Sequence, residues 1–135
     1  MTEHIPERIS ILMVEDNTMD AILTSEILSE SEKTCYQVLT VKTAIEALAF
    51  LHRMNGYENA SQPDLILLDL NLPKMHGFDF LAEIRKDNNL TAIPVVVLTT
   101  SEVQKDIDRA KELGVNGYLV KPIDLEKFES VILPH

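Results

Sequence analysis

The sequence contains a single cysteine, Cys35, among 135 residues, and it contains no tryptophan. One cysteine excludes an internal disulfide, and no run of about 18 apolar residues is present to span a bilayer. The first eight residues are polar and mixed in charge, so they lack the apolar core of a secretory signal. We therefore expect a cytoplasmic chain in a reducing compartment, with no membrane contact.

Basic residues are also scarce, since 12 lysines and arginines stand against 22 acidic residues and leave a formal net charge of −10. Such a balance repels a phosphate backbone, so we expect no binding to nucleic acid. Scattered carboxylates would only keep the chain soluble, whereas carboxylates gathered in a cleft would attract a divalent cation. The motifs decide between these two interpretations.

Apolar residues make up 45% of the chain, which is enough for one packed core. No linker, repeat or low-complexity tract divides the sequence, and a polar stretch over 54–63 is typical of a surface loop. We expect one domain over 1–135, with its core over about 9–132 and no separate output domain.

Short apolar runs alternate with longer stretches of 3.6-residue periodicity, a pattern that predicts five βα units and a parallel sheet. Three of the runs are nearly continuous in branched apolar residues, as expected for strands that are covered on both faces. The predicted strands are 9–14, 37–41, 65–68, 95–98 and 117–120.

Helix starts are indicated by capping residues at three places. Thr43 with Glu46, and Ser101 with Gln104, have the spacing of a capping box, and Asp124 can cap a last helix. Three apolar stripes are predicted to face the sheet. They are Ile22, Leu23 and Ile27; Ile45, Leu48 and Phe50; and Phe80, Leu81 and Ile84.

Polar side chains follow four of the five predicted strands, at the sheet edge where open parallel sheets bind their ligands. Glu15 and Asp16 follow the first strand and Asp69 follows the third. Three carboxylates at one edge repel each other unless they bind a cation, and hard oxygen ligands suit Mg²⁺. Thr99 and Lys121 end the fourth and fifth strands, where a hydroxyl and an ammonium group can hold phosphoryl oxygens.

These residues resemble the receiver domain of two-component response regulators over nearly the whole chain, from Ile9 to Ile132. The resemblance implies an α/β fold of the flavodoxin-like, doubly wound type, with five helices around a five-stranded parallel sheet in the order 2-1-3-4-5. The matching segments are 12–17 (LMVEDN), 67–73 (LLDLNLP), 97–101 (VLTTS) and 117–122 (GYLVKP), together with Gly77.

The resemblance also implies a role for each site residue. Asp69 would accept the phosphoryl group, and Asp16, Asp69 and the backbone carbonyl of Asn71 would bind Mg²⁺. Glu15 would act on the metal through water. Thr99 and Lys121 would hold the phosphoryl oxygens, while Tyr118 would change rotamer with Thr99. Such a domain catalyses only its own phosphorylation and dephosphorylation, so it is not an enzyme acting on a separate substrate.

His76 departs from the family pattern, which often has an acidic residue just before the glycine; we interpret it as a solvated side chain. The 94–101 segment, the 54–63 loop and the lack of an output domain are most similar to the small regulators that serve cyanobacterial phytochromes. This narrower resemblance implies a phytochrome-type histidine kinase as the upstream partner.

With no output domain, the signal is expected to change binding to another chain. The predicted surface comprises the fourth helix, fifth strand and last helix, and a homodimer through this face is expected. It mixes charged with apolar residues: Asp108, Arg109, Lys111, Glu112, Glu126, Lys127, Leu125 and Phe128.

Three alternatives remain from the residues alone. A haloacid-dehalogenase-like phosphatase also uses a strand-end aspartate, but it requires a second aspartate where this chain has Asn71. A flavin carrier would need a phosphate-binding loop where this chain has Glu15 and Asp16. The third alternative is a degenerate receiver that binds partners without being phosphorylated.

Overall fold

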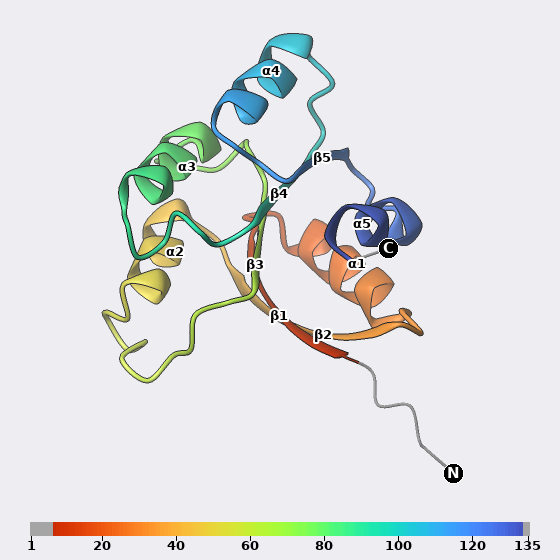
Figure 1. The fold of residues 1–135 in the computed structure, drawn as a ribbon, viewed down its shortest axis with the longest axis horizontal. Helices are drawn as coiled ribbons and strands as arrows, with labels where there is room; N and C mark the ends of the chain where they lie inside the picture. Colours follow the sequence, from red (N-terminus) through yellow and green to blue (C-terminus); the bar gives the residue numbers. More distant parts are fainter. Residues whose placement is uncertain (1–6, 134–135) are drawn as a thin grey trace.

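The computed structural model describes residues 7–133, in which five strands alternate with five helices (Figure 1). No helix in this part of the chain combines the length and the apolar character needed to cross a membrane. The elements are β1 (Glu7–Val14), α1 (Thr18–Ser29), β2 (Thr34–Val41), α2 (Ala44–Leu51), β3 (Leu65–Leu68), α3 (Gly77–Lys86), β4 (Val95–Thr99), α4 (Gln104–Glu112), β5 (Gly117–Val120) and α5 (Leu125–Ile132).

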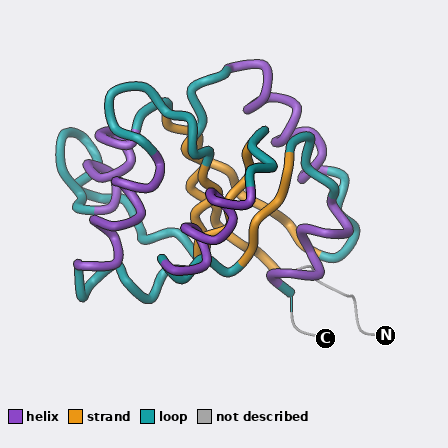
Figure 2. The backbone as a smooth tube through the Cα atoms, turned by 90° about the horizontal axis from the view of Figure 1, so that it is seen from above, coloured by secondary structure: helices purple, strands orange, loops and turns teal. Residues whose placement is uncertain are grey.

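The strands form one parallel sheet in the order β2-β1-β3-β4-β5. Helices α2, α3 and α4 contribute to the apolar core on one face, and α1 and α5 contribute to the core on the other. Figure 2 shows the strands enclosed between these helices. The predicted doubly wound α/β fold, with five helices and this strand order, is confirmed.

Neighbouring residues of the central strands belong to opposite cores. Leu12 and Val14 of β1 pack on the side of α2 and α3, whereas Ile11 and Met13 pack on the side of α1 and α5. Side chains alternate along a strand, so a strand covered on both faces needs apolar residues at every position. This requirement explains the continuous apolar runs in the sequence.

The predicted bounds of β3 and β5 agree with the structure, while β4 extends one residue further, to Thr99. β1 and β2 begin earlier than predicted because they pair with each other from Glu7 and Thr34 onward. The sequence does not reveal these extra residues because they do not form an apolar run: Glu7, Arg8 and Cys35 are exposed, and the buried residue among them is the polar Thr34. The 54–63 segment lies in the predicted loop, between α2 and β3.

Two of the three predicted helix caps are confirmed. The side chains of Thr43 and Asp124 accept hydrogen bonds from the backbone at the starts of α2 and α5. The prediction for Ser101 is wrong, because Val103 is the N-cap of α4 and its side chain makes no cap bond. Ser101 instead donates to Asp106, at 2.7 Å.

Two of the predicted apolar stripes are only partly correct, because Ile27, Leu48 and Phe50 face the cores as predicted and the other members of these two stripes do not. Ile22, Leu23 and Ile45 are 47%, 45% and 54% exposed, whereas Phe80, Leu81 and Ile84 are buried as predicted. The buried positions of α1 are Ala21, Thr24 and Leu28, and those of α2 include Ala44, Ala47 and Leu51. Both sets have the spacing i, i+3, i+7, and small residues in them allow each helix to approach the sheet closely.

Candidate functional site

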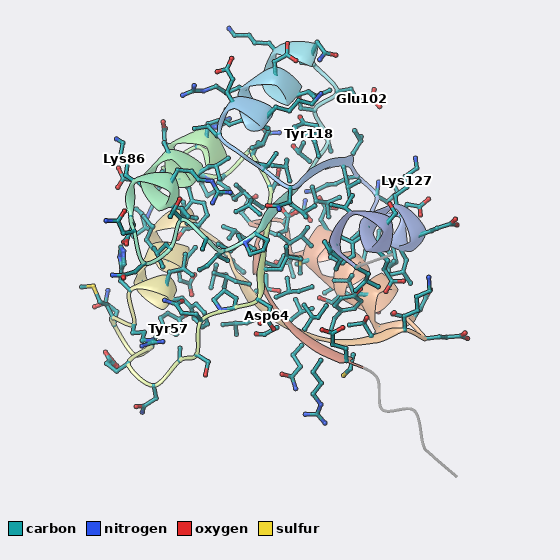
Figure 3. The ribbon with its side chains drawn as sticks, viewed as in Figure 1. Tyr57, Asp64, Lys86, Glu102, Tyr118 and Lys127 are labelled. Atoms are coloured by element: carbon teal, nitrogen blue, oxygen red, sulfur yellow. The ribbon has the colours of Figure 1, made fainter. Side chains whose placement is uncertain are left out.

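The predicted site residues come together at the carboxyl edge of the sheet, where β1, β3, β4 and β5 end. Glu15 and Asp16 directly follow β1, Asp69 follows β3, and Lys121 follows β5. Thr99 is the last residue of β4, and its backbone carbonyl accepts a hydrogen bond of 2.8 Å from the Lys121 N–H. Figure 3 labels Tyr118 near this edge and Asp64, which precedes β3, near the opposite one.

Carboxylate oxygens of Glu15, Asp16 and Asp69 all lie within 4.8 Å of one another. Glu15 and Asp69 are only 4% and 6% exposed, whereas Asp16 is open to solvent. A compact set of oxygen ligands with one solvent-accessible member matches the ligand preference of Mg²⁺, which keeps some of its water when bound. The site therefore fits a hard divalent cation.

The charge of this cluster is only partly balanced by the protein. Burial raises the pKa of Glu15 above its ordinary value, and the hydrogen bond from Lys121 and one from the Asn17 backbone act in the opposite direction. Asp69 adds a like charge that raises the pKa of Glu15 further. A bound cation would relieve both the burial cost and this repulsion.

The ammonium group of Lys121 contacts three carboxylates at once. Its Nζ lies 2.5 Å from Glu15 Oε1, 2.9 Å from Asp20 Oδ2 and 3.1 Å from Asp69 Oδ2. Burial by itself lowers the pKa of Lys121, but the hydrogen bonds to Glu15 and Asp20 and the charge of Asp69 outweigh burial and raise that pKa. Lys121 therefore stays charged under all physiological conditions.

Asp20 is the site residue that sequence reasoning missed. It lies in the first turn of α1, and its own N–H donates to the side chain of Asn17, the N-cap of that helix. The available signal was its position four residues after Asp16, which brings a carboxylate of the first helical turn back toward the sheet edge. An acidic residue in a first turn is more commonly interpreted as favourable to the helix dipole.

Thr99 is fully buried, and its hydroxyl has no hydrogen-bond partner among residues 7–133. An unpaired buried hydroxyl costs about 1–3 kcal/mol, so its presence indicates a use for the free hydrogen-bonding capacity. Tyr118 lies on the neighbouring strand β5, is half-buried, and donates its hydroxyl to the backbone carbonyl of Ser101 at 2.9 Å. The loop between β4 and α4 is therefore held by the predicted switch residue.

Residues of the loop after β3 pack closely against Asp69 and bind its carboxylate. The backbone N–H of Asn71 donates to Asp69 Oδ1 at 3.1 Å. A Cβ atom on Gly77 would lie 2.7 Å from Leu70 Cα and 2.9 Å from the Asp69 carbonyl, so only glycine allows this approach. His76 has a definite structural role, because its Nδ1 accepts from the Phe78 N–H and caps α3.

The family model described as "Response regulator receiver domain" matches residues 11–133. The chain belongs to this family. The predicted resemblance is thereby confirmed, and the receiver domain has its acidic cluster at the sheet edge where the sequence placed it.

Several relatives of this receiver domain are phytochrome response regulators. Response regulator Rcp1 of Synechocystis sp. is 45% identical over 116 residues, which cover 86% of this chain and 78% of that protein. A crystal structure of the phosphorylated cyanobacterial phytochrome response regulator RcpA is 46% identical and has a TM-score of 0.79. The match covers 92% of this chain and 89% of RcpA. The Mn²⁺-bound form of Rcp1 is 44% identical with a TM-score of 0.78, for 91% of this chain and 88% of that one.

Proposed function

We propose that this receiver domain takes a phosphoryl group from a histidine kinase onto Asp69 and signals by a changed affinity for another protein. The observation that carries the proposal is the arrangement around Asp69. A buried carboxylate lies beside two further carboxylates, one charged lysine contacts it, and a buried hydroxyl without a partner among residues 7–133 lies at the end of the adjacent strand. The structure of a phosphorylated relative supports the same function.

In the proposed reaction an oxygen of the Asp69 carboxylate attacks the phosphorus of a phosphohistidine. The new P–O bond forms as the P–N bond breaks, and the imidazole nitrogen leaves with the electron pair. Lys121 and Thr99 then hold oxygens of the transferred group. The domain supplies position and charge, so it catalyses only its own modification and, by attack of water, the later loss of phosphate.

The cation of this site is proposed to be Mg²⁺. Asp16, Asp69 and the backbone carbonyl of Asn71 would bind it, and Glu15 would contact it through water. When bound, it neutralises negative charge that shifts among the phosphoryl oxygens. The relative Rcp1 has a Mn²⁺-bound form, which supports the binding of a divalent cation by this receiver domain.

The function is tested by labelling with radioactive acetyl phosphate. We expect a covalent label that is stable in neutral denaturant, is lost on alkaline or hydroxylamine treatment as an acyl phosphate is, and requires Mg²⁺. Chelation with EDTA should lower labelling at least about 100-fold, because the transferred group then meets uncompensated carboxylates. Undiminished labelling in EDTA would contradict the metal requirement, and a label resistant to hydroxylamine would contradict an aspartyl acceptor.

Signal transmission is proposed to run through Thr99, Tyr118 and α4. Helix α4 has only Ala110 buried, and its N-terminus lacks a side-chain cap. The preceding loop is held by the hydrogen bond from Tyr118 to the Ser101 carbonyl. A phosphoryl oxygen that draws the Thr99 hydroxyl toward the site would change the packing beside Tyr118 and thereby the position of this loosely packed helix.

Thr99→Val is the matched test of this route, because valine has nearly the shape of threonine without its hydroxyl. The variant should be as stable as the wild type or more stable by up to about 1 kcal/mol, since a buried unpaired hydroxyl is removed. It should nevertheless lose the phosphorylation-dependent change in the Tyr118 environment, measured by tyrosine fluorescence or NMR. A full response in Thr99→Val would show that the signal takes another route.

The proposed partners follow from the relatives. A phytochrome-type histidine kinase is proposed as the donor, as the phytochrome response regulators among the relatives suggest. The acidic balance argues against a nucleic-acid partner. The proposed compartment is the cytoplasm.

A homodimer through α4, β5 and α5 is also proposed, with one correction to the expected face. Phe128 cannot contribute to it, because its ring is fully buried and packs edge-on against Tyr36. Its burial follows from α5 lying on the sheet, where the next residue, Glu129, accepts hydrogen bonds from Tyr36 and Ser31. The exposed apolar residues of the face are instead Val120 and Val103, at 37% and 58%.

The dimer is tested by sedimentation at tens of micromolar with and without beryllofluoride, a mimic of the phosphoryl group. A coupling of about 1–3 kcal/mol would tighten the dimer about 5- to 150-fold. Val120→Glu should weaken the dimer, whereas Ile45→Glu, an equally drastic change at an exposed position of α2 outside this face, should not. A monomer under both conditions would refute the dimer while leaving the phosphoacceptor role of Asp69 intact.

A further inference from the structure

Asp20 gives this site a carboxylate that neither the metal cluster nor the proposed phosphoryl transfer uses. Its Oδ2 lies 2.9 Å from Lys121 Nζ, and the two side chains are 39% and 11% exposed. Asp20 is not one of the three clustered cation ligands. Its contact to the site is the bond to the lysine that is proposed to hold the phosphoryl group, so a role for Asp20 rests on the proposed function.

The hydrogen bonds of Lys121 leave it no free donor. An ammonium group has three N–H bonds, and carboxylate oxygens of Glu15, Asp20 and Asp69 occupy all three positions. A phosphoryl oxygen can therefore approach Lys121 only in competition with a carboxylate. After phosphorylation, the hydrogen bond from Lys121 to Asp69 can be replaced by one to the phosphoryl group on Asp69. The hydrogen bond to Asp20 remains and continues to draw the ammonium group toward α1.

Asp20 also lies at an opening of the site. A surface hollow is lined by Asp20, Leu23, Thr24, Thr100, Lys121 and Pro122, so the carboxylate borders the space beside the ammonium group. A negative charge there repels an incoming phosphoryl dianion and attracts a cation. The charge of Asp20 therefore lowers the affinity of the site for the phosphoryl group and raises its affinity for the cation.

We propose that Asp20 is a positioning residue that restrains Lys121, so that it weakens the hold of the site on a phosphoryl group while it strengthens the hold on the divalent cation. The N-terminal turn of α1 thereby sets how readily the domain becomes phosphorylated. The restraint needs no movement of α1, because the Asn17 cap fixes the first turn in which Asp20 lies.

The test uses isothermal titration calorimetry on the full chain with two separate probes. Mg²⁺ alone is titrated first, and beryllofluoride is then titrated at saturating Mg²⁺. Asp20→Asn should bind Mg²⁺ about 2- to 5-fold more weakly and beryllofluoride about 3- to 10-fold more tightly, as the loss of one partly exposed charge allows. Asp20→Ala, which removes the contact as well as the charge, should change both affinities in the same directions.

Glu26→Gln is the matched control, because it removes an equal charge from an exposed position of the same helix. It should leave both affinities unchanged. Weaker binding of both probes in Asp20→Asn would overturn the proposal, since Asp20 would then support Lys121 rather than compete for it. Unchanged affinities would overturn it too.

Failure of the proposed function would give a different result. Asp69→Asn should no longer bind beryllofluoride, whereas it should remain folded. If the wild type does not bind beryllofluoride, or if Asp69→Asn binds it equally well, both the proposed function and the role of Asp20 are wrong. If only the Asp20 variants deviate from expectation, the role of Asp20 alone is wrong.

Discussion

Asp69→Asn is expected to abolish covalent phosphorylation, with labelling from acetyl phosphate falling at least about 1000-fold, because an amide oxygen is a far weaker nucleophile than a carboxylate. The variant should fold, since it removes one of the negative charges that surround Glu15. Circular dichroism and the extent of acyl-phosphate labelling measure the two effects separately.

Asp64→Asn is the control for this experiment, because Asp64 lies just before the strand that Asp69 follows. Its carboxylate accepts a hydrogen bond from the Ser10 N–H at 2.8 Å, far from the acidic cluster. An asparagine oxygen can accept the same bond, so labelling should match that of the wild type. Undiminished labelling of Asp69→Asn would show that another residue is the phosphoacceptor.

Lys121→Ala is expected to uncouple phosphorylation from the response. Labelling should persist at a reduced rate, but the change in partner or self affinity should be lost, because no ammonium group then draws the phosphoryl oxygens toward β5. Sedimentation with beryllofluoride and tyrosine fluorescence measure this loss. A full phosphorylation-dependent response in Lys121→Ala would contradict the proposed transmission.

The structure also predicts a stability effect that the sequence does not suggest. A lysine at a strand end contributes little to a core, but Lys121 is the ammonium partner of the buried carboxylates Glu15 and Asp69. Without it, metal-free protein should be less stable by about 1–3 kcal/mol at neutral pH. Saturating Mg²⁺ should restore most of the loss.

The pH dependence of this deficit has a definite sign. Burial already raises the pKa of Glu15, and Lys121 supplies the largest opposing effect. In Lys121→Ala the pKa of Glu15 should therefore rise further, so the deficit should shrink as the pH falls and Glu15 takes up a proton. Lys127→Ala, at an exposed position of α5, should show neither the deficit nor its pH dependence.

Sequence patterns were sufficient to predict the fold class, the strands of the sheet centre and the edge at which chemistry occurs. Continuous apolar runs identify strands buried on both faces, and the residues that end them must meet at one edge because the strands are parallel. Asp69, Glu15, Asp16, Thr99 and Lys121 were therefore predictable as neighbours. A helix cap such as Thr43 was predictable for a similar reason, since its partner lies three residues away.

Two features could be known only from the tertiary structure: which face of α1 is buried, and which carboxylates contact the ammonium group of Lys121. Helical periodicity allows several neighbouring stripes, and the sheet selects the one with Ala21, Thr24 and Leu28 because small side chains permit close packing. Asp20 contacts Lys121 across 101 positions of the chain. Spacing along a sequence reports local neighbours, whereas such contacts depend on how a helix sits against a sheet edge built from distant strands.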